Sequence, residues 1–142
     1  MNNFAEYDKI LTRSCMMMVG ICILVIAIIS IAYPFVKKAD MDNRKKQKYS
    51  ALICLLFVLG AVIIGGYTSY KTISDIQNQS YIVYNGSFVS DKDGTGKVYI
   101  VDSSGKKMTL SVAAYTIPDG THNGKIVYGK KTKIVVDYQI YN

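Results

Sequence analysis

Several residue types are scarce in this chain of 142 residues, and each shortage argues against a class of function. Glutamate occurs once, at Glu6, histidine occurs once, at His122, and no arginine follows Arg44. Nucleic-acid-binding surfaces use arginine for bidentate contacts with bases and phosphates, so the arginine-free C-terminal half argues against a nucleic-acid partner. No nucleophile motif accompanies His122 and no pair of carboxylates stands out, so the sequence predicts a protein that is not an enzyme.

Cysteine is absent from the C-terminal half, and the three cysteines of the chain lie in apolar stretches. Cys15, Cys22 and Cys54 lack the spacing of metal ligands, so they are interpreted as small packing residues. The segment 91–96, DKDGTG, begins like a calcium-binding loop but lacks a third acidic ligand and a closing glutamate. It is interpreted as a hairpin turn, and the sequence predicts neither a metal nor a cofactor.

Charged residues are also absent from two long apolar runs, residues 14–36 and 49–70. A helix rises about 1.5 Å per residue, so a run of about twenty residues crosses a bilayer core about 30 Å thick. A chain this short has too little other material to bury two such helices on every side. The runs are therefore predicted to be transmembrane helices in contact with the lipid bilayer.

Positive charge is concentrated between the two runs, where residues 37–48 carry six of the seventeen basic side chains. The segments that lie on the other side of the membrane next to the runs carry three: Lys9, Arg13 and Lys71. Because cytoplasmic loops are enriched in lysine and arginine, residues 37–48 are predicted to be cytoplasmic. The tail of residues 1–13 and a module of residues 71–142 are then extracytoplasmic, in a cell-membrane protein with two spans.

Small residues gather on the second run and allow close approach of the first. They are Gly60, Ala61, Gly65 and Gly66. We expect them to pack within the helical hairpin, and the alternative is a dimer seam or a docking face for another membrane protein.

Beyond Tyr70 the hydrophobic period changes to two, which is typical of half-buried strands. Five strands are predicted, at residues 81–89, 97–102, 107–113, 124–128 and 132–140. In the last strand Val136 is expected on the inner face and Val135 on the outer face. Five short strands indicate a small antiparallel barrel or sandwich, of SH3-like or OB-like size, so that the chain is an α+β membrane protein.

The longest predicted connection, residues 114–124, is the candidate for binding a protein partner. Tyr115 and Ile117 offer apolar surface, Pro118 stiffens the loop, and His122 lies near its end. The alternative is that Tyr115 and Ile117 fold back and cap the core of the module.

Frequent Lys, Asn, Ile and Tyr are typical of a low-GC bacterial source. By its architecture alone, the predicted chain resembles small bacterial membrane proteins of two kinds. One kind is immunity proteins, which neutralise a toxin that acts at the membrane or cell wall. The other is accessory subunits of a transporter or secretion complex. An immunity-type protein that binds its partner through the exported module is the first hypothesis, and an accessory subunit is the alternative.

Overall fold

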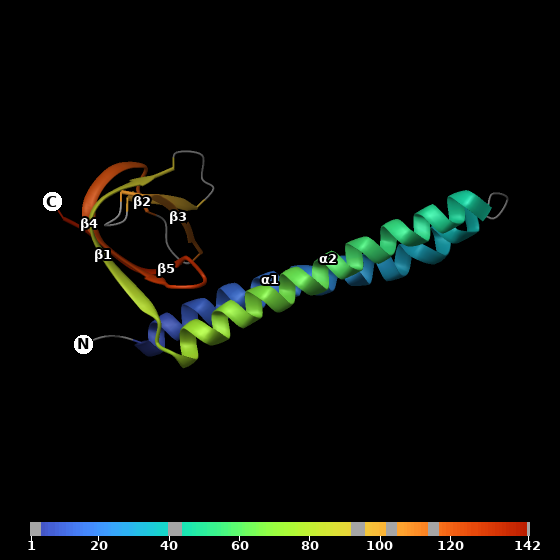
Figure 1. Ribbon diagram of the computed structural model, residues 1–142, viewed down its shortest axis with the longest axis horizontal. Helices are drawn as coiled ribbons and strands as arrows, with labels where there is room; N and C mark the ends of the chain where they lie inside the picture. The colour runs from blue at the N-terminus through green and yellow to red at the C-terminus, as the bar shows by residue number, and fades with distance from the viewer. Residues whose placement is uncertain (1–3, 40–43, 92–95, 102–104, 114–116, 142) are drawn as a thin grey trace. The chain divides into compact units, whose positions relative to one another are not determined.

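The computed structural model describes residues 4–39, 44–91, 96–101, 105–113 and 117–141. Two helices are followed by five strands, labelled in Figure 1. The chain divides into two compact units, each with its own contacts. One unit is residues 16–70, and the other combines residues 1–15 with residues 71–142.

The first unit consists of the middle parts of two long helices, α1 (Phe4–Ala39) and α2 (Arg44–Gln77). Both are long and apolar enough to cross a membrane. In the apolar stretch of each helix, 0% of the residues of α1 and 11% of those of α2 are buried. The predicted helical runs are thus confirmed as helices. Each helix also extends further than predicted, since α1 begins within the predicted tail and both enter residues 37–48.

The end of α2 is fixed by a left-handed residue. Gln79 has a φ of 45°, and the N–H of Ser80 bonds back to the carbonyl of Asp75 at 2.9 Å. This return bond satisfies a carbonyl that the last helical turn leaves without a partner. The chain then enters the first strand at Tyr81 after a turn of three residues, 78–80.

The second unit contains a closed barrel with the strand order β1-β2-β3-β5-β4, visible in Figure 1 as a curled sheet. Its strands are β1 (Tyr81–Ser90), β2 (Lys97–Val101), β3 (Lys107–Val112), β4 (Gly120–Gly129) and β5 (Ile134–Ile140). The prediction of a wholly antiparallel sheet is wrong at one pair, because β3 and β5 are parallel. Since β4 pairs with both β1 and β5, the barrel closes where β5 meets β3, and these two strands run in the same direction.

The fourth strand begins earlier than its prediction. It starts at Gly120, with a φ of 114°, and pairs with β1 along its whole length, from Gly120 opposite Ser90 to Gly129 opposite Tyr81. The predicted loop of residues 114–124 is therefore shorter, because residues 120–124 are strand. Sequence periodicity missed this extension because GTHNG contains no apolar residue to alternate.

The barrel interior is filled by side chains from every strand. Its buried members are Phe88, Val98, Ile100, Leu110, Ile117, Ile126, Tyr128 and Val135. In β3, Met108, Leu110 and Val112 pack inward, which agrees with the period of two in the sequence beyond Tyr70.

The alternation predicted for β5 is wrong at its start. Val135 packs in the barrel interior, whereas Val136 is buried on the outer face. The register shifts here, with Val135 opposite Tyr128 and Asp137 opposite Val127, so β5 carries a bulge at Val136. A bulge places two successive residues on one side of the strand, which simple alternation cannot anticipate.

Candidate functional site

Two of the four predicted helix-packing glycine and alanine positions form the contact between α1 and α2. Ala61 and Gly65 are buried, and a Cβ added at Gly65 would lie 3.7 Å from the Cβ and Sγ of Cys22. The small side chains at this four-residue spacing allow the two helices to approach closely. A Cβ at Gly60 or Gly66 would meet nothing within 4 Å, so neither glycine is needed for this contact.

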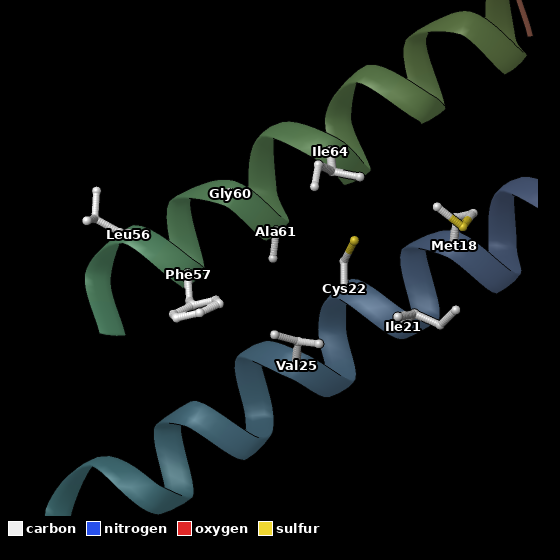
Figure 2. Close-up of a pocket in the computed structure, with 9 residues that line it drawn as sticks. All are labelled: Met18, Ile21, Cys22, Val25, Leu56, Phe57, Gly60, Ala61 and Ile64. Carbon is white, nitrogen blue, oxygen red and sulfur yellow. The ribbon is translucent and has the colours of Figure 1, made fainter. Parts of the chain in front are cut away.

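A groove runs between the two helices beside this contact. Figure 2 shows the side chains of both helices around it. It has a volume of about 450 Å³ and is lined by Met18, Ile21, Cys22, Val25, Leu56, Phe57, Gly60, Ala61 and Ile64. Apart from the Cys22 thiol, these side chains are hydrocarbon or thioether groups, so the groove is apolar.

Of the residues predicted for partner binding, His122 lies beside Pro118, whereas Ile117 points into the barrel core. Ile117 is only 7% exposed and belongs to the barrel core, while Pro118 is exposed. His122 lies in β4, where its ring contacts Phe88 and its Nε2 is 2.7 Å from the carbonyl of Pro118. Tyr115 lies outside the described residues. The burial of Ile117 removes its side chain from any contact surface.

The barrel unit includes the first turns of α1, which cover the outer face of β4 and β5. Tyr7 and Leu11 are buried against Val127 and Val136, with Phe4, Ile10, Ile76, Tyr81 and Ile134 packed around them. Leu11 and Val136 are both fully buried. This second apolar cluster explains why the bulged Val136 points outward, and it joins the N-terminal turns of the chain to its last strand.

Two tyrosine hydroxyls reinforce this contact by donating to carboxylates. Tyr7 donates to Asp137 at 3.1 Å, and Tyr81 donates to Asp8. Burial and the neighbouring Asp8 carboxylate raise the pKa of Tyr81 well above its ordinary value, since both disfavour a phenolate. Tyr81 therefore remains a hydrogen-bond donor throughout the physiological pH range.

Asp75, in the last turns of α2, binds the turn between β4 and β5. Its side chain is fully buried and accepts bonds from the N–H of Lys131 at 3.0 Å and from the N–H and Oγ1 of Thr132 at 2.8 and 2.9 Å. A Cβ at Gly129 would lie 2.6 Å from the same carboxylate, so only glycine leaves room for it. Sequence reasoning missed this role, because Asp75 looked like a polar residue of the helix.

The first strand has an edge that is only partly paired. Among the described residues it pairs with β4 over ten positions, but with β2 only from Phe88 to Ser90. A cleft of about 580 Å³ opens beside the unpaired part, lined by Ile82, Val83, Tyr84, Asn85, Val101, Met108, Tyr128 and Lys133. No sequence signal located this cleft, since it depends on where β1 leaves β2.

Within the described part of the chain, no three His, Cys, Asp or Glu side chains gather in a group that could hold a metal ion. Residues 92–95 of the predicted hairpin turn DKDGTG lie outside that part. The chain matches no family model, no curated protein and no solved structure in the comparisons made. Any proposal about its function therefore rests on its own residues.

Proposed function

We propose that the chain is a non-enzymatic integral membrane protein whose α1 and α2 anchor an extracytoplasmic barrel that binds a protein partner. The observation that supports it is the surface of the helical pair. Ile23 is 62% exposed, Phe57 62% and Ile63 67%, although water disfavours such side chains. Apolar side chains on all sides of a helix are suited to lipid, whereas a soluble helical pair would carry a polar face.

The contact between the N-terminal turns and the barrel supports a hairpin arrangement in the membrane. Leu11 and Val136 are packed in one cluster, and Tyr7 bonds to Asp137, which supports a topology with the N-terminal turns and the last strand on the same side of the membrane. Two spans return the chain to the side from which it started. The six basic residues of segment 37–48 then favour the cytoplasm for the hairpin loop and the outside for the barrel.

The partner is proposed to be a bacterial toxin, in an immunity-type role. The last turns of α2 belong to the barrel unit and lead into β1 after three residues, which supports a barrel that stays close to the membrane surface, where such a toxin acts. The alternative, an accessory subunit of a transporter or secretion complex, is favoured by the apolar groove between α1 and α2, which has the character of a contact face for a further helix.

The membrane arrangement predicts a specific labelling pattern. Thr121, exposed on the barrel, and Asn43, in the basic loop segment, would each be replaced by Cys in a chain whose native cysteines are changed to Ala. An impermeant thiol reagent applied to intact cells should label the Thr121→Cys chain and spare the Asn43→Cys chain. Labelling of Asn43→Cys alone would invert the arrangement, and recovery of the chain in the soluble fraction would exclude the membrane.

The binding role predicts where a partner can be crosslinked. A photo-reactive residue would be placed in living cells at Thr121 or Val83 on the barrel, or at Ile63 on α2, all of which are exposed. An immunity-type protein should crosslink to a secreted protein through a barrel position and not through Ile63. Crosslinking to a membrane protein through Ile63 alone supports the accessory role, and no crosslink at any position contradicts both roles.

A further inference from the structure

Within the described parts of the chain, one edge of β1 has no partner strand near Val83 and Asn85, and a cleft opens beside it. We propose that an extended, acidic segment of a partner protein adds to this edge as a further strand. This inference rests on the proposed binding function and states which surface is used and which chemistry it recognises. In such strand addition, main-chain bonds supply affinity and alternate side chains enter pockets.

The direction of the backbone groups in β1 follows from its two ends. The carbonyl of Ser80 accepts from the N–H of Lys130 at 2.8 Å, so the even-numbered residues direct their main-chain groups toward β4. The N–H of Asp91 donates to the carbonyl of Lys97 at 3.1 Å, so the odd-numbered residues direct theirs to the opposite edge. Because these groups alternate along a strand, Val83 and Asn85 point theirs away from β4.

That edge of Val83 and Asn85 is left without a partner strand in the described parts of β2 and β3. The nearest pairing on this side starts at Phe88, opposite Ile100. At both ends of this stretch a main-chain group is already hydrogen-bonded within the chain. The N–H of Tyr81 bonds to the carbonyl of Gln79, and the carbonyl of Ser87 accepts from the Tyr84 hydroxyl at 2.8 Å. Two N–H and two C=O groups between them match a segment of about three to five residues.

A glycine at position 86 makes the bond from the Tyr84 hydroxyl to the Ser87 carbonyl possible. Gly86 has a φ of 156°, and a Cβ at this position would lie 2.9 Å from the Tyr84 hydroxyl oxygen. With glycine there, the Tyr84 side chain reaches the Ser87 carbonyl and forms one wall of the cleft. The open stretch of β1 therefore ends at a defined point, which fixes the length of segment that can be added.

The cleft beside the edge is suited to apolar side chains of the added strand. Ile82, Tyr84 and Met108 line it and also pack against the barrel core. Val83 stands beside them with 52% of its surface exposed. Natural proteins usually protect an open strand edge with lysine, proline or a covering element, and residues 81–87 contain neither lysine nor proline.

The charges around the cleft favour an acidic segment. The Lys133 ammonium lies 5.3 Å from the centroid of the Tyr128 ring, and both residues line the cleft. Lys107 is exposed opposite Val101, another lining residue, and none of the described lining residues is Asp or Glu. A second copy of this chain would bring a net charge of +7 and the same lysines, so like-charge repulsion disfavours pairing between copies.

The test uses the full chain in detergent micelles and two synthetic peptides, acetyl-Glu-Val-Glu-Val-Glu-Val-amide and its counterpart with Lys in place of Glu. In NMR titrations the acidic peptide should shift the Val83 and Asn85 amides and slow their hydrogen exchange. The Lys peptide should bind at least about tenfold more weakly, because it places cations beside Lys133. Lys133→Gln should reduce the difference in affinity between the acidic peptide and the Lys peptide.

A pair of substitutions at Val83 distinguishes the contribution of its main-chain N–H to peptide binding from that of its side chain. Val83→Pro removes the N–H that points to the open edge and replaces the valine side chain by a ring, and an edge strand tolerates proline. It should weaken binding of the acidic peptide about tenfold, whereas Val83→Ala, which keeps the N–H, should bind within about threefold of the native chain. Asn85→Pro provides the same comparison if Val83→Pro lowers the melting temperature.

Several outcomes would overturn the inference. Among them are equal binding by folded Val83→Pro and Val83→Ala, equal binding of both peptides, or amide shifts confined to another face. Concentration-dependent shifts of the Val83 and Asn85 amides without peptide would instead assign the edge to a second copy. In cells, crosslinking through Thr121 with none through Val83 would refute this site and leave the binding function standing, whereas the absence of any crosslink would refute the function itself.

Discussion

Replacing Leu110 with Asp is expected to unfold the barrel. Leu110 is fully buried and faces Val98, also fully buried, across the β2–β3 ladder. A carboxylate at this position would have no partner, and its desolvation together with the lost apolar contacts costs about 4 kcal/mol or more. Small barrels have little stability to spare, so the chain should lose its protease-resistant core and its cooperative thermal transition.

The adjacent residue provides the matched control. Thr109 is exposed and pairs with Tyr99 on the outer face, so Thr109→Asp should change the free energy of unfolding by no more than about 1 kcal/mol. Both substitutions introduce the same charge one residue apart. Equal damage from the two in a protease-resistance assay would mean that the register of β3 is wrong by one residue.

Replacing Asp75 with Ala is expected to destabilise the barrel unit by roughly 3 kcal/mol. The carboxylate accepts bonds from two backbone N–H groups and one hydroxyl of the β4–β5 turn, and it is fully buried. Bonds to a charged acceptor are stronger than neutral ones, and the substitution takes this acceptor away from two N–H groups and one hydroxyl of the turn. The turn should loosen, with faster hydrogen exchange at Lys131 and Thr132 and a lower melting temperature.

A graded pair of variants tests this role of Asp75. Asp75→Asn keeps one acceptor oxygen and should lose about half as much stability as Asp75→Ala. Asp119→Ala removes an exposed carboxylate of the same unit and should change the melting temperature very little. If Asp75→Ala had the same melting temperature as Asp119→Ala, the Asp75 carboxylate would not stabilise the turn.

Local patterns in the sequence were sufficient to predict the helices and strands and part of the contact between α1 and α2. Two uncharged runs predict two helices, since a long apolar stretch satisfies its backbone locally whatever surrounds it. The alternation in β3 correctly placed Leu110 inside, because that strand pairs regularly along its length. The spacing of Ala61 and Gly65 indicated the side on which α2 meets α1, although Gly60 and Gly66 point to open space.

Long-range pairing decided the features that local patterns could not specify. The bulge at Val136, the β3–β5 parallel pair and the unpaired edge at Val83 each depend on which strands meet after the chain has closed on itself. The same holds for Asp75, whose partners Lys131 and Thr132 are more than fifty residues away.

By itself, the sequence determined that the chain has two long apolar helices, a basic segment between them and a small β module. These properties follow from composition and periodicity, which act over a few residues. Only the tertiary structure decided that the N-terminal turns pack on the barrel and that β1 keeps an open edge beside a lysine-flanked cleft. Such features arise from contacts between residues far apart in sequence, and no local pattern encodes which distant surfaces will meet.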